Sequence, residues 1–137
     1  MAALEWEELL VSLTHALPQP VTQETGLDGG TVLVGGEPAE VVVQLARSWV
    51  TVSEFSVEWD GPHHPITRII PFGRIRWRRL DAIRAIEILR ALIAGARQAR
   101  RAKFRVCQSC EALTPPESMH DEEMCRSCAA RSRGAAY

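Results

Sequence analysis

Near the start of the chain, hydrophobic side chains recur at three- and four-residue intervals, which is the spacing of one face of a helix. Acidic residues at positions 5, 7 and 8 suit the positive end of a helix dipole, and Pro18 cannot continue the helix. The sequence therefore predicts an amphipathic helix that ends before Pro18. The hydrophobic residues on its face are Trp6, Leu9, Leu10, Leu13 and Leu17.

Beyond this helix the pattern becomes that of short strands. Pairs of glycines at 29–30 and 35–36 mark turns around an aliphatic run at 31–34, and a second run follows at 41–45. Another extended segment runs from Ile66 to Trp77, with interruptions at Pro71 and Gly73 that suit an edge strand or a bulge. We expect three or four short strands in this part of the chain.

The segment from Trp49 to Trp59 alternates between hydrophobic and polar residues, as a half-buried strand does. This alternation places Glu54 and Glu58 on the outer face. The later strand has arginine at every second position near its end, and antiparallel pairing of the two strands predicts ion pairs between these acids and arginines. The arginines are Arg74, Arg76 and Arg78, and the residues expected on the buried side are Phe55, Val57, Trp59, Ile75 and Trp77.

From Leu80 to about Lys103 the hydrophobic period is again helical, although Gly95 weakens the last turns. The order of helix, short strands and long helix predicts an α+β fold. In this fold a small antiparallel sheet packs with an N-terminal helix and a long second helix, and a C-terminal zinc finger follows. We divide the chain into an α+β domain at 1–103 and a four-cysteine zinc-binding module at 104–137.

Charge is unevenly distributed along the chain, although the net charge is only −1. Residues 1–65 hold ten acids and one base, residues 66–110 hold twelve bases and two acids, and residues 111–137 have a net charge of −2. The sequence has no apolar run near the roughly 20 residues of a membrane span, and its acidic start is unlike a signal peptide. We therefore expect a cytoplasmic protein without membrane contact.

Four cysteines form two Cys-x-x-Cys pairs, separated by fourteen residues. Each pair places two thiolates on one turn, where both reach a metal ion at about 2.3 Å, and two pairs complete a tetrahedron. A tetrahedron of four thiolates leaves no position for a substrate. The spacing predicts one structural zinc ion, held by Cys107, Cys110, Cys125 and Cys128.

The residues FRVCQSC, the segment from Pro115 to Glu117 and the tail MCRSCAARSRG resemble treble-clef or zinc-ribbon fingers. The resemblance covers residues 104–137. It implies zinc binding, with the first pair on a turn and the second pair opening a helix at about 126–133, and it names no partner. Three arginines near the cysteines are candidates to balance the charge of the thiolates: Arg105, Arg126 and Arg131.

The cysteines and histidines have alternative roles that the sequence allows us to compare. Disulfides do not suit a reducing compartment, and a thioredoxin-like site would need one reactive pair after a strand. His120 lies between the cysteine pairs and is an alternative ligand, but the module lacks the second histidine or asparagine of a His-Asn-His nuclease. His63 and His64 lie in a loop between prolines, where they either face solvent or bind a metal.

The basic run at the end of the second helix contains no acid. A cationic helix end beside a zinc module suits phosphate binding, whereas the acidic loop of the module opposes it. That loop also carries Met119 and Met124, and methionine adapts to varied apolar partners. We assign the run to a partner-binding surface or to a docking site for an acidic segment; its basic residues are Arg97, Arg100, Arg101, Lys103 and Arg105.

The sequence contains no phosphate-binding glycine loop and no arguable nucleophile and base, so we expect no enzymatic activity. The favoured function is that of a zinc-binding adaptor or regulatory protein that acts through protein–protein binding. The alternative is a DNA- or RNA-binding protein that uses the run from Arg97 to Arg105. A redox-sensitive zinc switch is the third hypothesis, and a homo-oligomer is compatible with all three.

Overall fold

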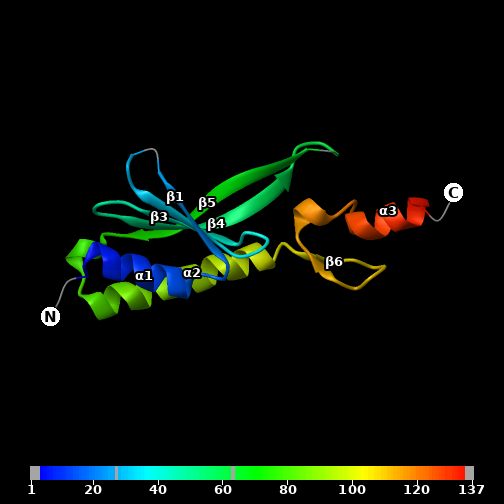
Figure 1. The fold of residues 1–137 in the computed structure, drawn as a ribbon. Helices are drawn as coiled ribbons and strands as arrows, with labels where there is room; N and C mark the ends of the chain where they lie inside the picture. The colour runs from blue at the N-terminus through cyan, green and yellow to red at the C-terminus, as the bar shows by residue number, and fades with distance from the viewer. Residues whose placement is uncertain (1–3, 27, 63, 135–137) are drawn as a thin grey trace. The chain divides into compact units, whose positions relative to one another are not determined.

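The structure is a computed structural model that describes residues 4–26, 28–62 and 64–134. The chain runs through a helix, five strands and a long helix before it enters a small finger with its own hairpin and helix (Figure 1). It divides into two compact units. Unit 1 comprises residues 1–56 and 69–100, and unit 2 comprises residues 57–68 and 101–137. Within the described ranges, no helix has both the length and the hydropathy of a membrane span.

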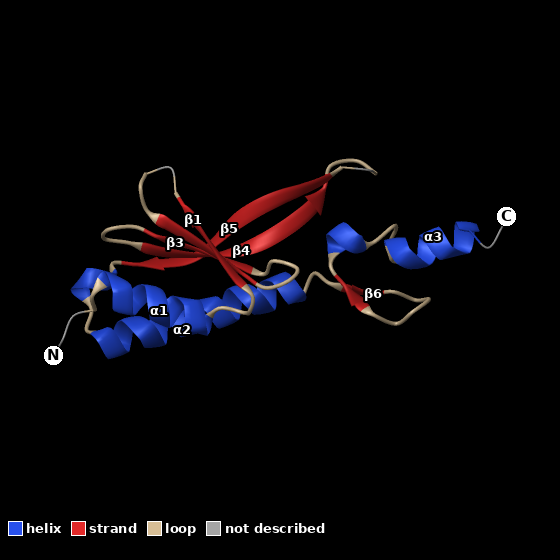
Figure 2. Cartoon of the chain, in the orientation of Figure 1, coloured by secondary structure: helices blue, strands red, loops and turns tan. Residues whose placement is uncertain are grey.

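The strands form one antiparallel sheet in which they lie in sequence order (Figure 2). The pairing of Leu33 with Val43 and of Val43 with Val52 sets the register of the three central strands. The last two strands are joined by a tight turn, in which the Asp60 N–H donates to the His64 carbonyl at 2.7 Å. The strands are β1 (Val21–Thr25), β2 (Thr31–Gly35), β3 (Val41–Leu45), β4 (Val50–Trp59) and β5 (Pro65–Ile75).

Two helices cover one face of this sheet, α1 (Trp6–Ala16) and α2 (Ala82–Arg101) (Figure 1). The first helix ends where the sequence predicts, with the Leu17 N–H donating to the Leu13 carbonyl at 3.0 Å before Pro18. Asp81 precedes the second helix, and its carboxylate accepts the Arg84 N–H at 3.0 Å, as an N-cap does. The predicted α+β fold class is confirmed.

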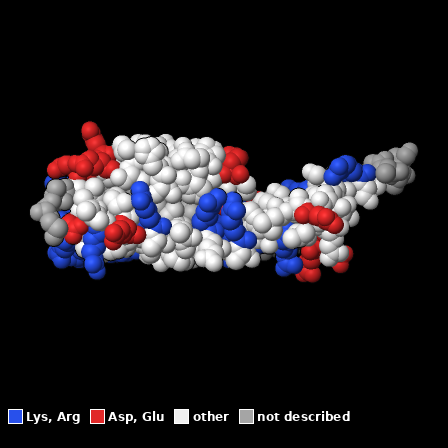
Figure 3. Space-filling view, turned by 90° about the horizontal axis from the view of Figure 1, so that it is seen from below, with Lys and Arg blue, Asp and Glu red and all other residues white. Residues whose placement is uncertain are grey.

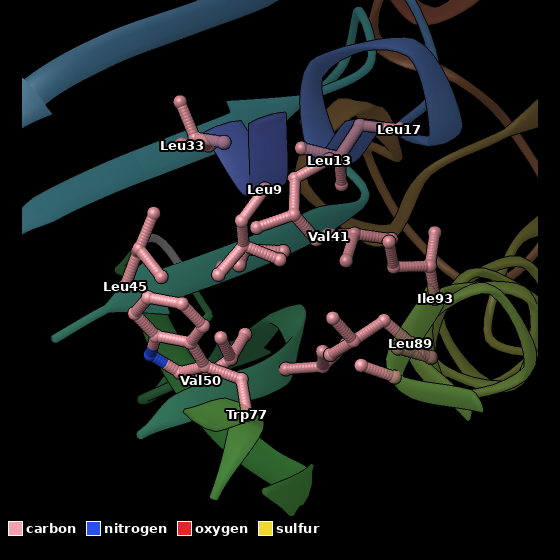
Figure 4. Packing of buried hydrophobic residues seen from close by; sticks show 14 of the residues in the cluster. Leu9, Leu13, Leu17, Leu33, Val41, Leu45, Val50, Trp77, Leu89 and Ile93 are labelled. Carbon is pink, nitrogen blue, oxygen red and sulfur yellow. The ribbon is translucent and has the colours of Figure 1, made fainter. Parts of the chain in front are cut away.

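The core of unit 1 lies between the sheet and the two helices (Figure 4). Trp77, in the short 3₁₀ turn Trp77–Arg79, is fully buried, and its indole N–H donates to the Ala46 carbonyl at 3.0 Å. Burial of each large apolar side chain contributes about 1.5 to 3 kcal/mol to stability. The other buried residues include Leu9, Leu13, Leu33, Val41, Val43, Leu45, Val50, Val52, Leu89 and Ile93.

β1 is a strand that the hydrophobic pattern did not predict. It lies at one edge of the sheet and pairs with β2 from Val21 opposite Gly35 to Thr25 opposite Thr31. All of its residues after Val21 are exposed, and none of them is hydrophobic. A strand that buries so little leaves no periodic signal in the sequence.

The predicted face of Glu54 in β4 was wrong, whereas Val57 is buried and Glu58 is exposed as predicted. Val50 and Val52 point into the core, and the same alternation carries Glu54 and Ser56 inward, where they are 5% and 0% exposed. Glu54 is therefore buried and cannot pair on an outer face with the arginines of β5. Glu58 forms its ion pair with Arg68, at 2.8 Å between Nε and Oε2.

Gly95 does not end α2 but allows β5 to approach it. A Cβ atom at this position would lie 2.6 Å from Cε2 of Phe72, a distance that real Cβ contacts do not show. Gly73 is similarly close to the Leu92 side chain, at 2.6 Å. The two glycines thus let the edge strand pack along the helix.

Candidate metal centre

The first cysteine pair lies on a two-stranded hairpin formed by β6 (Arg105–Val106) and β7 (Leu113–Thr114). Val106 pairs with Leu113, so Cys107 directly follows the first strand and Cys110 lies in the turn between the strands. The turn is closed by the Cys107 N–H donating to the Ala112 carbonyl at 3.0 Å. Both thiols are thus carried by one short turn.

Glu111, directly after Cys110, has a φ of 64°, which is the left-handed region that favours glycine. This conformation turns its N–H back to the Cys107 carbonyl, at 2.8 Å. The sequence gives no sign of the turn, because glutamate is not the residue expected there. The surrounding hydrogen bonds hold this residue in a conformation that costs an ordinary side chain about 1 to 2 kcal/mol.

The second cysteine pair is positioned by a turn and a helix. The Asp121 carboxylate accepts the N–H groups of Glu123 and Met124 at 2.8 and 2.9 Å, and these bonds lower the pKa of Asp121. Cys125 follows, and Cys128 lies in the first turn of α3 (Arg126–Gly134). The predicted helix at about 126–133 is confirmed.

The four cysteine sulfurs, Cys107, Cys110, Cys125 and Cys128, all lie within 4.8 Å of one another. The Sγ atoms of Cys110 and Cys125 are 3.9 Å apart. A tetrahedral ion with bonds of about 2.3 Å separates its sulfur ligands by about 3.8 Å. The cysteines are thus positioned to hold a metal ion.

No family model, curated protein or solved structure matches this chain. The function of the site therefore has to be derived from its own geometry. Cys107, Cys125 and Cys128 are buried, whereas Cys110 is exposed. One cysteine of the site therefore lies at the surface of the finger, and the other three lie inside it.

The pKa values of Cys107 and Cys110 are shifted in opposite directions. Backbone N–H groups of Cys110 and Cys125 donate to the Cys107 sulfur and lower its pKa from 9.0 to about 6. At Cys110 the Ala112 N–H lowers the pKa, but hydrogen bonds with the sulfurs of Cys107 and Cys128 outweigh it and raise the pKa to about 11. The cluster therefore retains at least one proton near neutral pH, which a bound cation would displace.

One of the three arginines expected to balance the thiolates contacts a cysteine. Arg131 donates to the Cys128 sulfur at 3.3 Å, and the same hydrogen bond raises the pKa of Arg131. Arg126 instead lies over the ring of Trp59, with 5.4 Å between its guanidinium carbon and the ring centroid. Arg105 lies on β6, where it is exposed. Backbone N–H groups also contribute to charge balance, as the Cys125 N–H does at 3.3 Å from the Cys107 sulfur.

The described histidines do not take part in this cluster. Within the described part of the chain, the residues that could hold an ion together are the four cysteines alone. His120 is exposed, and its N–H donates to the Met124 carbonyl at 2.8 Å. His64 is exposed in its loop, and His63 lies outside the described residues.

The predicted basic surface at the end of α2 is only partly accessible. Arg97 pairs with the buried Glu40 at 3.1 Å, and Arg100, with an exposed fraction of 0%, donates to the Ala39 carbonyl at 3.0 Å. Arg100 is therefore not a surface residue. Its guanidinium group instead donates a hydrogen bond to a loop in the acidic half of the chain. Arg101, Lys103 and Arg105 remain exposed. On the face that Figure 3 views, basic and acidic side chains adjoin one another in several places.

A cavity of about 550 Å³ lies within unit 2 and shares Met119 with the buried cysteine cluster, and no sequence pattern predicted it. Trp59, from the tip of the β4–β5 hairpin, lines it, and the indole N–H of this residue donates to the Pro116 carbonyl at 3.0 Å. This contact joins residues that are 57 positions apart. The other lining residues are Gly61, Pro62, Arg105, Pro116, Met119, His120, Asp121 and Glu122.

Proposed function

We propose that the four cysteines hold one structural zinc ion in a finger of the treble-clef type. The observation that carries the proposal is the mutual approach of four sulfurs, with the 3.9 Å separation expected for tetrahedral zinc. A hairpin turn supplies two ligands and the start of a helix supplies two more, which is the arrangement that the resemblance implies. Sulfur ligands favour zinc over magnesium, calcium or manganese.

Such an ion is fully coordinated by protein, so it has no position for a substrate or an activated water. We therefore propose a role in binding, as an adaptor or regulatory protein, with no catalysis at this centre. The ion would fix the hairpin and α3 of the finger. The surface of the finger would then be the part that a partner contacts.

The partner-binding surface that we propose surrounds the cavity lined by Trp59 and Met119. Trp59 supplies a rigid aromatic wall, because its indole N–H is already bonded to Pro116. Val106 and Leu113 form an exposed cross-strand apolar pair, with exposed fractions of 56% and 58%. Acidic residues of the finger loop, including Asp121 and Glu122, border the cavity, so a protein segment with an apolar anchor and a basic flank fits best.

A nucleic-acid partner is less favoured by the same contacts. Arg97 and Arg100, two members of the basic run, are engaged within unit 1. Arg105, another member of the run, lines the same cavity as Asp121 and Glu122, and these acids would repel a phosphate backbone. Protein binding accounts better for the exposed apolar pair.

Metal analysis of the purified full-length protein under reducing conditions tests the zinc proposal. We expect one zinc per chain, and we expect cobalt substitution to give the intense absorption of a tetrahedral thiolate complex. Cys110→Ser should abolish that absorption or shift it strongly, and His120→Ala should leave it unchanged. A chain purified without metal and unable to bind added zinc would contradict the proposal.

The partner proposal is tested by capture from nuclease-treated lysate with matched charge-introducing variants. Leu113→Asp should eliminate the captured protein, because it places a charge in the exposed pair of the finger. Ile83→Asp is the control, since Ile83 is 73% exposed on α2 in unit 1. Capture that depends on nucleic acid, or that survives Leu113→Asp, would count against a protein-binding finger.

A further inference from the structure

A second cavity lies in unit 1, far along the sequence from the cysteines, and arginines dominate it. Its volume is about 270 Å³, and it is lined by Ser48, Trp49, Arg76, Arg78 and Arg79. Ser48 and Trp49 come from the turn between β3 and β4, whereas the arginines follow β5. Two segments that are distant in sequence thus build one cationic hollow.

The arginines of this cavity are not neutralised by the acids that the sequence suggested. Among the described residues, no ion pair joins a carboxylate to Arg74, Arg76, Arg78 or Arg79. Glu58 pairs with Arg68, and Glu54 is buried. All four arginines are exposed to solvent, so a ligand can reach their guanidinium groups.

Three of the four guanidinium groups lie over aromatic rings, and one of them also bonds to a backbone carbonyl. Arg74 and Arg76 lie over the Trp49 ring, with 3.8 and 4.8 Å between the guanidinium carbon and the ring centroid. Arg78 donates to the Arg47 carbonyl at 2.6 Å and lies 4.3 Å from the Trp77 ring centroid. These contacts reduce the side-chain entropy that a ligand would otherwise have to remove.

The turn that carries Ser48 and Trp49 is fixed as well. The Ala46 N–H donates to the Trp49 carbonyl at 2.8 Å, and the Ala46 carbonyl accepts the indole N–H of the buried Trp77 at 3.0 Å. The cavity is therefore connected to the core of unit 1. The wall of the cavity therefore forms when unit 1 folds and does not require a ligand.

We propose that this cavity binds the phosphomonoester of a phosphorylated side chain on a partner protein. Guanidinium groups bind phosphate oxygens in pairs through their planar fork, and clusters of arginine recognise phosphorylated motifs in this way. The volume of about 270 Å³ has room for a phosphoryl group together with the side chain that carries it, with Ser48 in the lining. None of these residues belongs to unit 2, so the proposal does not rest on the metal centre.

Two features favour a single phosphoryl group over a nucleic-acid strand. The Trp49 ring is already stacked by two arginines, which leaves it poorly suited to stack a base. Glu5, the residue before α1, and Glu7 in its first turn flank Trp6, whose ring lies 6.3 Å from that of Trp77. A polyanion that extended from the cavity toward Trp6 would approach these acids, whereas a compact phosphoryl group would not.

Nuclear magnetic resonance of the full-length, metal-loaded protein gives a direct test. The probe is a five-residue peptide of alanine and glycine with a central phosphoserine, and the control is the same peptide with serine. We expect the phosphopeptide to shift the indole N–H of Trp49 and the amide of Ser48 in a saturable way. The Trp59 indole, in unit 2, should not move.

Variants then identify the binding groups. Arg76→Ala should weaken binding of the phosphopeptide by at least about tenfold, and Arg76→Lys should restore it only in part, because lysine lacks the fork. Arg90→Ala, at an exposed position on α2, removes the same charge elsewhere and should leave binding unchanged. Ser48→Ala, a smaller change, should weaken binding about threefold if Arg76→Ala proves too unstable to measure.

Three outcomes would overturn the proposal. The serine peptide could bind as well as the phosphoserine peptide, or Arg76→Ala and Arg90→Ala could have equal effects. A single-stranded oligonucleotide could also bind more tightly than the phosphopeptide while shifting the same resonances, which would identify a nucleic-acid site instead. Failure of the finger to bind protein would leave all of these measurements unaffected.

Discussion

The two units of the chain are stabilised by different means. In unit 1 the buried cluster consists of aliphatic side chains and Trp77, packed between a sheet and two helices. In the described part of unit 2, the buried cluster consists of three cysteines and Met119, with Met124 packed against them. Segments as short as those of unit 2 usually need a metal ion, a disulfide or a partner to fold. Under the function proposed above, a metal ion would take the place of the hydrophobic core in the finger.

Removal of the metal should produce the largest difference between the units. A chelator with a reducing agent should unfold the finger, because structural zinc contributes on the order of 10 kcal/mol or more to folding. Hydrogen exchange is the measurement: the amides of Glu111 and Ala129 should lose protection, while those of Leu33 and Val43 should keep it. Loss of protection in both sets would show that unit 1 depends on the metal.

The reverse experiment removes the largest side chain from the core of unit 1. Trp77→Ala should lower the free energy of unfolding of unit 1 by about 3 to 5 kcal/mol, since it leaves a cavity and an unpaired Ala46 carbonyl. Denaturant titration measures this change, with the exposed Ile83→Ala as control. The cobalt absorption of the finger should be unchanged at concentrations of denaturant that leave the finger folded. A large drop in cobalt affinity would argue that the two units fold as one.

A smaller effect is expected from the ion pair between the acidic and basic halves of the chain. Arg97→Ala should destabilise unit 1 by about 1 to 2 kcal/mol, because Glu40 is nearly buried while Arg97 is half exposed to solvent. Arg90→Ala is the matched control and should change stability by less than about 0.5 kcal/mol. Combination with Glu40→Gln should give less than the sum of the two single effects. Full additivity would show that the pair does not contribute.

The smallest expected effect is in the turn of the metal centre. Glu111→Gly should strengthen metal retention by up to about fivefold, because glycine adopts a φ of 64° without strain. Competition with a calibrated chelator measures the change. Glu111→Gln keeps the strained backbone and removes the charge, so it separates the two contributions. Equal effects of the two substitutions would assign the gain to charge.

The cysteine spacing predicted the grouping of the ligands because each pair lies within one turn of chain. Local spacing fixes how near Cys107 and Cys110 can come, and the structure brings the second pair to them. The groups that contact the sulfurs were harder to predict from the sequence. Arg131 was one of three candidates for charge balance, and nothing in the sequence distinguished it from Arg126.

The hydrophobic periodicity predicted the helices and the central strands, and it failed where burial does not follow hydrophobicity. In β4, Val50 and Val52 set the inward face, and the alternation then buries Glu54 and Ser56 despite their polarity. Phe55 and Val57 suggested the opposite face. β1 gave no signal, because an exposed edge strand needs few hydrophobic side chains.

Contacts between distant segments were beyond any pattern in the sequence. The Trp59 indole reaches Pro116, and Arg97 reaches Glu40, each across 57 positions. The uneven distribution of charge was compatible with pairing inside the fold or with a charged partner, and it did not show where contacts form. Pairing between the acidic and basic halves of the chain depends on how the sheet packs against α2. A short stretch of sequence does not contain that information.

The pairing of Arg97 with Glu40 also has a consequence for the order in which the protein acquires its structure on the ribosome. Glu40 and all five strands of the sheet leave the exit tunnel before the arginine that neutralises this carboxylate. At about 5 to 20 residues per second, translation separates the two partners by about 3 to 11 s. During that interval the nascent chain carries nine net negative charges over its first 65 residues and an apolar sheet face without α2. The acidic half is therefore expected to stay unfolded and soluble until the basic half has been synthesised.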